Sequence, residues 1–297
     1  IIRDYPGLPP ENIKGHGWAF MDKKVGVIIP SFNQGDYIEE AIRSVICNKK
    51  HADIAVAVMD GGSQDGTKSI ILKYEAEINV WCSEPDGGQA DAINKGIRAL
   101  PDCRYYMWLN SDDVFENEHA VSKIVDYAEK NRFEVCYGLS HFIDRGGRQT
   151  GEYPVEEFSY EKLGNRCFLS QPSVLFSRKA YETTGPVNPE LKMCLDYEYW
   201  IRLARRYEFG FIKEYIGSTR IYKDTKTATM QQQHLEEAVR ILMKYYGRVP
   251  MHWIAAKALA DRPGSILQCV PRRVLMILLY PFRKEIIRMS LEGSRDD

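Results

Sequence analysis

Two adjacent acids, Asp112 and Asp113, follow the apolar run Tyr105-Tyr106-Met107-Trp108-Leu109. Such a run is typical of a buried strand, and open α/β folds place ligand sites at the carboxyl ends of their strands. Adjacent carboxylates repel each other and are costly to bury without a cation, whereas hard oxygen ligands suit Mg²⁺ or Mn²⁺ shared with substrate phosphates. The pair therefore predicts a divalent-metal site. The alternative is that these acids cap a helix beginning near Asn117.

The composition is that of an ordinary soluble enzyme. A chain of 297 residues holds one large α/β domain or two smaller ones, and its net charge of −1 gives no reason to expect nucleic acid as a partner. The seven cysteines are scattered without a C-x-x-C pair, which favours reduced thiols in a cytosolic protein over disulfides or a zinc site. We find neither a signal segment at the start nor an apolar stretch of the ~18 residues that a spanning helix needs.

Apolar strands alternate with amphipathic helices in the first half of the chain. We expect strands at 25–30, 54–59, 78–82 and 105–109, and helices at 36–47, 68–76 and 90–99. This alternation with short loops predicts an α/β fold with a doubly wound, mostly parallel sheet. Further along we expect strands at 133–138 and 171–176, a hairpin turn around 145–147, and helices at 196–206 and 231–246.

Polar or glycine residues follow each strand of the first half. They are Asn33, next to the aromatic Phe32, then Asp60 and Ser63, then Asp86, Gly88 and Gln89, then Asp112 and Asp113. Because parallel strands end at one edge of the sheet, these four segments should converge on one nucleotide site. Neither a G-x-G-x-x-G after the first strand nor a G-x-x-x-x-G-K-[ST] occurs, which disfavours a dinucleotide dehydrogenase and a P-loop NTPase.

Six motifs in order carry a resemblance to a known family. They are Val-Ile-Ile-Pro-Ser-Phe-Asn (27–33), Met-Asp-Gly-Gly-Ser-Gln-Asp-Gly-Thr (59–67), Gly-Gly-Gln-Ala-Asp-Ala-Ile-Asn-Lys-Gly (87–96), Leu-Asn-Ser-Asp-Asp (109–113), Gln-Pro-Ser (171–173) and Leu-Asp-Tyr-Glu-Tyr-Trp-Ile-Arg (195–202). With these motifs the chain resembles the inverting glycosyltransferases of family 2, which have the GT-A fold. The resemblance covers roughly residues 25–230.

The resemblance implies a role for each motif residue in binding a nucleotide sugar. Phe32 would lie against the nucleobase, Asp60 would accept hydrogen bonds from base or ribose, and Gly88 and Gln89 would let the backbone approach the nucleotide. The same site would include Pro30, Asn33 and Gly61. Asp112 would lie near the ribose and the metal, and Asp113 would be the main protein ligand to Mn²⁺ or Mg²⁺. The ion would neutralise charge on the departing diphosphate.

Asp196 matches the position of the family's catalytic base. A sugar hydroxyl is too weakly acidic to attack unaided, so a positioned carboxylate must take its proton. The alternative is that Asp196 only caps its helix. Glu198 is the second candidate base, although it points elsewhere on the helix. Trp200 and Leu203 are expected in the core.

The segment Arg220-Ile-Tyr-Lys-Asp-Thr-Lys-Thr227 resembles a family segment in which many members carry His at the position of Tyr222. Neutral Tyr is a poor ligand to Mg²⁺. Lys223 and Lys226 could compensate the charge of the diphosphate instead, and an exposed basic loop is the alternative interpretation.

We expect an N-terminal arm at 1–24, a catalytic domain at 25–230 and a helical extension at 231–297. The catalytic domain would divide into a nucleotide-binding half (25–113) and an acceptor half (114–230). Residues 265–291 mix apolar and basic side chains, as in a helix attracted to an anionic membrane surface. A helix packed on the catalytic domain explains the same pattern.

Together these features predict a metal-dependent inverting glycosyltransferase that moves one sugar from a nucleotide-diphosphate sugar, with UDP favoured, to a hydroxyl of a glycan or lipid-linked glycan. The resemblance suggests bacterial surface-polysaccharide assembly by a cytoplasmic enzyme, peripheral on the inner face of the plasma membrane. Two alternatives stay open, a nucleotidyltransferase on a similar fold and a non-catalytic module that binds nucleotide sugar or glycan. Whether the protein forms a homodimer is also open.

Overall fold

The computed structural model describes residues 25–223 and 225–260. The arm expected at 1–24 and the amphipathic segment expected at 265–291 lie outside the described residues. The chain forms two compact units, residues 1–225 and 226–297, which are described separately.

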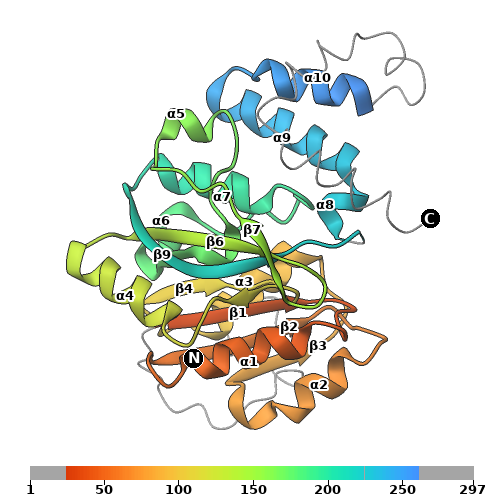
Figure 1. Ribbon diagram of the computed structural model, residues 1–297, viewed down its shortest axis with the longest axis vertical. Coiled ribbons are helices and arrows are strands. Elements are labelled where there is room, and N and C mark those ends of the chain that lie inside the picture. The colour runs from red at the N-terminus through yellow and green to blue at the C-terminus, as the bar shows by residue number, and fades with distance from the viewer. Residues whose placement is uncertain (1–24, 224, 261–297) are drawn as a thin grey trace. The chain divides into compact units, whose positions relative to one another are not determined.

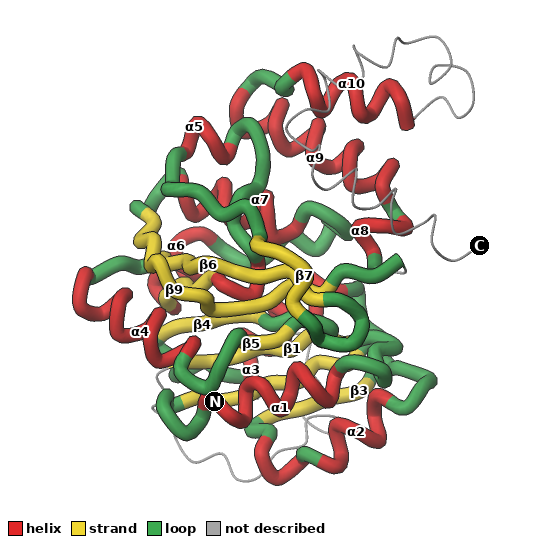
Figure 2. Tube along the Cα trace, in the orientation of Figure 1, coloured by secondary structure: helices red, strands yellow, loops and turns green. Residues whose placement is uncertain are grey.

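The first unit is built on one mixed sheet flanked by helices (Figures 1 and 2). Its strands are β1 (Val25–Ser31), β2 (Ile54–Asp60), β3 (Val80–Ser83), β4 (Tyr105–Trp108), β5 (Val114–Phe115), β6 (Val135–Ile143), β7 (Gln149–Glu152), β8 (Val174–Ser177) and β9 (Phe209–Arg220). They lie in the order β3-β2-β1-β4-β8-β6-β9-β5, and β7 pairs with β6. The expected α/β fold with a mostly parallel sheet is confirmed.

The helices of the first unit connect these strands. They are α1 (Ile38–Asn48), α2 (Thr67–Lys73), α3 (Gln89–Ala99), α4 (Ala120–Asn131), α5 (Tyr160–Leu163), α6 (Arg178–Thr184) and α7 (Leu195–Ala204), with 3₁₀ turns η2 (Glu75–Glu77) and η3 (Gln171–Ser173). α3 packs on β1 and β2, α1 packs on β1 and β5, and α4 packs on β6 and β9.

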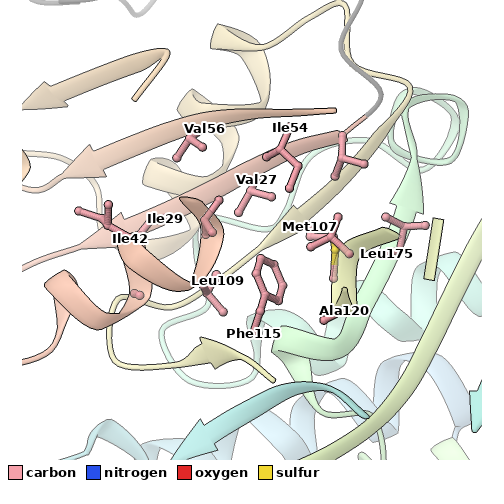
Figure 3. Packing of buried hydrophobic residues seen from close by; sticks show 14 of the residues in the cluster. Val27, Ile29, Ile42, Ile54, Val56, Met107, Leu109, Phe115, Ala120 and Leu175 are labelled. Carbon is pink, nitrogen blue, oxygen red and sulfur yellow. The ribbon is translucent and has the colours of Figure 1, made fainter. Parts of the chain in front are cut away.

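Both faces of the central sheet are buried, which explains why its strands read as continuous apolar runs rather than alternating ones. In β1 the side chains of Val27 and Ile29 enter the cluster that α1 and α4 cover, whereas Ile28 faces α3 (Figure 3). Gly96 of α3 is required at this contact, because a Cβ there would lie 2.5 Å from the Ile28 side chain. Successive residues of a strand point to opposite faces, so β1 joins the two layers.

The parallel strands β3, β2, β1 and β4 bring their carboxyl ends to one edge. β1 pairs in register with β2 from Val25–Ile54 to Ser31–Asp60, and its other side pairs with β4. The loops that follow these four strands therefore leave the sheet together. This arrangement positions the polar loop residues that the sequence analysis selected.

Two expectations about the second half of this unit are corrected. The strand expected at 171–176 begins only at Val174, because Gln171–Ser173 form a 3₁₀ turn that contains Pro172. Proline cannot donate to a strand ladder, which favours the turn. The strand expected at 133–138 extends to Ile143, and it forms with β7 the hairpin expected around residues 145–147.

The second unit is helical in its described part. It contains α8 (Lys226–Thr229), α9 (Gln231–Tyr246) and α10 (Met251–Ala260), and α9 packs against α10. The expected helix at 231–246 is confirmed. In the described part of the chain, none of the helices combines the length and apolar content needed to cross a bilayer.

Candidate active site

The loops after β1 and β2 are joined by hydrogen bonds at the carboxyl edge of the sheet. The amide of Asn33 donates to Ser63 Oγ (2.7 Å), and the amide of Gln64 donates to Asn33 Oδ1 (2.9 Å). Asn33 has a left-handed backbone (φ 52°), a conformation that Asn adopts more readily than most residues. Beside these bonds the ring of Phe32 is 60% exposed, which is unusual for a large apolar side chain. Phe32 is therefore a free aromatic face at this edge.

Asp60, at the end of β2, is a buried carboxylate that joins the loop after β2 to the end of β3. It is 1% exposed and accepts hydrogen bonds from the Ser63 amide (3.0 Å), from Ser63 Oγ (2.5 Å) and from Ser83 Oγ (2.7 Å). A carboxylate can accept about four hydrogen bonds, so Asp60 keeps capacity for one more donor.

The loop after β3 approaches the loop after β2 closely. A Cβ on Gly61 would lie 3.3 Å from the Asp86 carboxylate and from the Phe32 ring, so a side chain there would crowd both. Asp86 Oδ1 accepts from the amide of Gly88 (2.7 Å), which has φ 103°, a conformation that favours glycine. Burial raises the pKa of Asp86. Pro30 is buried within β1 and pairs with Met59, so its contribution is to the strand.

The acid pair is connected to α3 through amide side chains. Gln89 Nε2 donates to Asn110 Oδ1 (2.7 Å), and Asn110 Nδ2 donates to Asp113 Oδ2 (3.1 Å). Asp113 is 2% exposed, and its Oδ1 accepts from the Arg220 amide (2.9 Å). Burial, and then the charge of neighbouring Asp112, raise the pKa of Asp113 well above its ordinary value. Asp113 is thus held in the protein by a donor on each oxygen.

Asp112 is placed differently from Asp113. Its side chain is partly exposed, and its Oδ2 accepts from the Tyr222 hydroxyl (3.0 Å). Tyr222 packs on Tyr37 with ring centroids 4.9 Å apart, and burial together with Asp112 raises the pKa of Tyr222. Neither acid caps a helix, because β5 follows directly and α4 begins at Ala120 with no side-chain cap. The capping alternative is therefore excluded.

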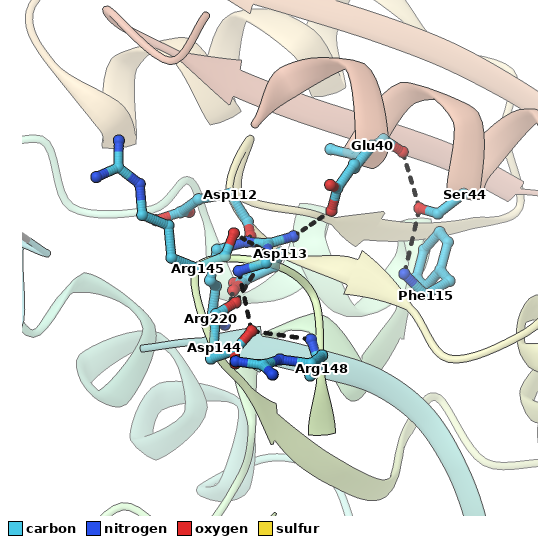
Figure 4. Close-up of polar contacts among 11 residues, drawn as sticks. Glu40, Ser44, Asp112, Asp113, Phe115, Asp144, Arg145, Arg148 and Arg220 are labelled. Carbon is cyan, nitrogen blue, oxygen red and sulfur yellow. Dashed lines mark hydrogen bonds and ion pairs between the residues drawn. The ribbon is translucent and has the colours of Figure 1, made fainter. Parts of the chain in front are cut away.

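Arg220, at the end of β9, organises the acid pair, and the sequence analysis did not select it (Figure 4). Its Nε donates to the Asp112 carbonyl (2.8 Å), its Nη1 donates to the Asp144 and Arg145 carbonyls (3.0 Å each), and its Nη2 pairs with Glu40 Oε2 (2.5 Å). The Arg220 side chain is fully buried. The only signal in the sequence was its position at the start of the segment 220–227.

Asp196 lies in the first turn of α7 and is partly exposed. Its Oδ1 accepts from the amide of Tyr197 (2.8 Å), and burial raises its pKa to about 6. The N-cap of α7 is Cys194, so Asp196 is not the cap that the alternative supposed, although it accepts from one amide of the first turn. Glu198 is 3% exposed and forms an ion pair with Arg202 (2.9 Å), so it is already neutralised.

Aromatic stacking connects α7 to β4, the strand that leads into the acid pair. Trp200, one turn after Asp196, stacks on Trp108 with centroids 4.9 Å apart and planes 11° apart. The side-chain amide of Gln171 also donates to the Trp108 carbonyl. Trp200 and Leu203 are fully buried, as expected. The helix α7 is thus held on β4 through Trp200.

The structure brings together most of the selected donor-site residues. Gln89 and the acid pair form one hydrogen-bonded group. Phe32, Asn33, Gly61 and Gly88 belong to the neighbouring loops after β1, β2 and β3, here called the linked loops. Lys226 begins α8 in the second unit, so its role beside a diphosphate stays a prediction.

The fold is the GT-A fold, which many glycosyltransferases share. Residues 26–185 match the sequence profile described as Glycosyl transferase family 2, and the chain belongs to that family. The match covers the strands and loops that carry most of the selected donor-site residues.

Named relatives agree with this assignment. An uncharacterized glycosyltransferase of Rickettsia prowazekii is 28% identical over 72% of this chain and 69% of its own. The putative teichuronic acid biosynthesis glycosyltransferase TuaG of Bacillus subtilis is 27% identical over 61% of this chain and 72% of its own. Other relatives are longer proteins, of which the chain covers as little as 20%.

A solved structure supports the fold. The mannosyltransferase PcManGT of Pyrobaculum calidifontis, in complex with GDP-Man and Mn²⁺, has a TM-score of 0.56 and 17% sequence identity. The similarity covers 88% of this chain and 82% of that one.

Proposed function

We propose that this glycosyltransferase moves one sugar from a nucleotide-diphosphate sugar to an acceptor hydroxyl with inversion, and that Asp196 is the base. The observation that carries the proposal is the Asp196 carboxylate, with its pKa raised to about 6, on a helix that stacks against the strand leading into the acid pair. At neutral pH such a group is ionised yet more basic than an ordinary Asp, which suits general-base catalysis.

The chemical step needs one proton acceptor and one displacement. Asp196 takes the proton of the acceptor hydroxyl while the hydroxyl oxygen forms a bond to the anomeric carbon. The bond between that carbon and the diphosphate oxygen breaks with its electron pair, so nucleoside diphosphate leaves. A single displacement from the opposite face inverts the anomeric configuration. Because Glu198 is paired with Arg202, it is a poorer candidate for this role.

The acid pair fits a divalent metal ion, Mn²⁺ or Mg²⁺. Two adjacent carboxylates, one of them buried with a raised pKa, are a donor set that a cation would stabilise. A bound ion would neutralise charge on the departing diphosphate. We propose both acids as ligands, with the partly exposed Asp112 more accessible to the ion than Asp113, which is 2% exposed.

The linked loops suit the nucleotide. The exposed Phe32 ring offers a face for a base, and Asp60 keeps capacity to accept one donor from base or ribose. Gly61 lets Asp86 and the Phe32 ring approach the loop after β2, because a Cβ there would lie 3.3 Å from both. The structural neighbour was solved with GDP-Man, whereas the sequence favours a UDP-sugar as donor. A panel of candidate donors should therefore contain both GDP-sugars and UDP-sugars.

For the acceptor we propose a glycan or lipid-linked glycan in polysaccharide assembly. The relative named for teichuronic acid biosynthesis supports this class. We further propose action at the cytoplasmic side of the plasma membrane, and the basic and apolar segment 265–291 is the feature that would bind anionic lipid.

The proposal is tested by thermal shift with UDP-sugars and GDP-sugars, each with and without Mn²⁺, followed by NMR of the product anomer. Ligands that bind the folded state raise its apparent stability by mass action. We expect stabilisation by one nucleotide class that grows with Mn²⁺, and a product of inverted configuration. Retention of configuration, or no stabilisation by any nucleotide sugar, would contradict the proposal.

A further inference from the structure

A cluster of metal-binding side chains lies away from the acid pair, near the other end of α1. His51, Glu118 and His119 are all exposed, and one ligand atom from each lies within 4.8 Å of the other two. His51 Nε2 is 3.8 Å from Glu118 Oε2, and His119 Nε2 is 4.0 Å from Glu118 Oε1. The two imidazole rings have centroids 4.0 Å apart.

This cluster is remote from the candidate active site. Glu40, near the start of α1, pairs with Arg220 beside the acid pair, whereas His51 follows the last turn of the same helix. A helix of 11 residues is about 16 Å long at ~1.5 Å per residue. His51 precedes β2 and therefore lies at the amino edge of the sheet, opposite the linked loops.

Buried Asn48 fixes the two loops that supply the ligands. It is 1% exposed, its Nδ2 donates to the Asn117 carbonyl (2.8 Å), and its Oδ1 accepts from the Val121 amide (3.0 Å). The His51 amide donates to the Asn48 carbonyl (3.0 Å), and the His119 amide donates to Asn117 Oδ1 (2.9 Å). The Asn48 side chain thus ties the end of α1, which His51 follows, to the turn that contains His119, so the proximity of the two histidines is built into the fold.

The chemistry of the three ligands selects the kind of ion. Two imidazoles and a carboxylate suit Zn²⁺, Co²⁺ or Ni²⁺, whereas Mg²⁺ and Mn²⁺ prefer oxygen ligands. Zinc bonds to nitrogen of about 2.0–2.1 Å in tetrahedral geometry place ligand atoms about 3.3 Å apart. The ligand atoms all lie within 4.8 Å of one another, and rotations of these exposed side chains would bring them to that value.

We propose that His51, Glu118 and His119 form a second metal site, distinct from the acid pair, that binds one ion of the zinc class with water completing the coordination. The ion would tie the end of α1 to the start of α4 and stabilise the first unit. Lys50 Nζ lies 3.5 Å from Glu118 Oε2, so its charge opposes the ion. The proposal does not depend on the sugar-transfer reaction.

The test is calorimetric titration of the metal-stripped full chain with Zn²⁺, together with the visible spectrum of the Co²⁺ form. We expect one zinc ion per chain at this site, bound far more tightly than Mn²⁺. At a hundredfold excess over the dissociation constant, zinc should raise Tm by roughly 5 °C. His51→Gln and His119→Gln should each weaken zinc binding about tenfold or more.

Three controls separate this site from other ligands. His252→Gln removes an imidazole of the second unit and should leave zinc affinity unchanged. Cys47→Ser removes an exposed thiol one turn before His51 and should also leave it unchanged, with no thiolate charge-transfer band in the Co²⁺ form. Lys50→Gln should strengthen binding several-fold.

Zinc affinity that is the same in His51→Gln, His119→Gln and the parent chain would overturn the proposal. Weaker binding in Lys50→Gln would also overturn it, and this exposed substitution gives an answer even if a histidine variant folds poorly.

Discussion

The carboxylates of the donor side and the carboxylate of α7 are held in opposite ways. Asp60 and Asp113 accept from residues in distant loops, including Ser83 and Arg220. Asp196 instead accepts from the amide of its own neighbour, Tyr197, and its pKa is raised to about 6. Burial raises the pKa of Asp113 as well, so the contrast lies in the hydrogen bonds. Those of Asp60 and Asp113 join distant parts of the chain and fix geometry, whereas that of Asp196 is local.

The largest expected effect is on turnover in Asp196→Asn. A positioned general base contributes roughly 10²- to 10⁴-fold, so kcat should fall by that factor while the fold is retained. Release of nucleoside diphosphate with the active donor measures it. Asp126→Asn, an exposed acid of α4, is the matched control and should keep full activity. A loss below tenfold in Asp196→Asn would assign the base elsewhere.

The next effect is on stability in Arg220→Met. This change removes a fully buried guanidinium that pairs with Glu40 and donates to three backbone carbonyls. Removing one partner of a buried charged network costs about 3–5 kcal/mol of unfolding free energy. Urea unfolding measures this cost. Arg148→Met, an exposed arginine paired with Asp144, is the control and should cost less than about 1 kcal/mol. Equal losses in the two variants would remove Arg220 from its organising role.

A smaller effect of opposite sign is expected for the stability of Asp196→Asn. Because the pKa of Asp196 is raised from 3.8 to about 6, the folded state binds its proton more tightly than the unfolded chain does. Stability is therefore lost as pH rises through about 6 and regained as pH falls toward 4. The neutral amide avoids this loss, so the variant should be more stable than the parent by about 1–3 kcal/mol at pH 8.

The stability gain of Asp196→Asn should shrink toward zero near pH 4. Urea unfolding of both proteins at pH 4.5 and pH 8 measures it. A gain that does not depend on pH would show that ionisation of Asp196 is not the cause.

The smallest effect is expected for Tyr222→Phe, which removes the hydroxyl that donates to Asp112. One hydrogen bond to a partly exposed carboxylate is worth about 1 kcal/mol, and the stack on Tyr37 should persist. Tyr74→Phe is a matched variant, because the Tyr74 hydroxyl also donates to a carboxylate, that of Glu39 (2.7 Å). Comparing the two by urea unfolding sharpens the contrast. If Tyr74→Phe lowers the free energy of unfolding more than Tyr222→Phe does, the hydrogen bond to Asp112 contributes no more than an ordinary surface contact.

The local elements could be predicted from sequence because they depend on nearby residues. The runs that became β1, β2 and β4 are apolar on both faces, and the helices between them have regular apolar spacing. Pro172 showed the limit of this reasoning, since the residues around it read as a strand but form a 3₁₀ turn.

The site was predicted in part. Motif order and strand ends indicated which loops converge, and the acid pair does join Gln89 through Asn110. The role of Arg220 could not be predicted from the sequence, because it donates to backbone carbonyls 75 to 108 residues away. Every residue has a backbone carbonyl, so no residue type marks these partners. The unequal burial of Asp112 and Asp113 depends on the same long-range contacts.

The most direct test of the central contrast is calorimetric titration of nucleoside diphosphate with Mn²⁺ into Asp112→Asn and Asp196→Asn. We predict that Asp196→Asn binds as the parent chain does, whereas Asp112→Asn binds at least about tenfold more weakly because a ligand to the ion is lost. Equal loss of affinity in both variants, or loss only in Asp196→Asn, would contradict the account.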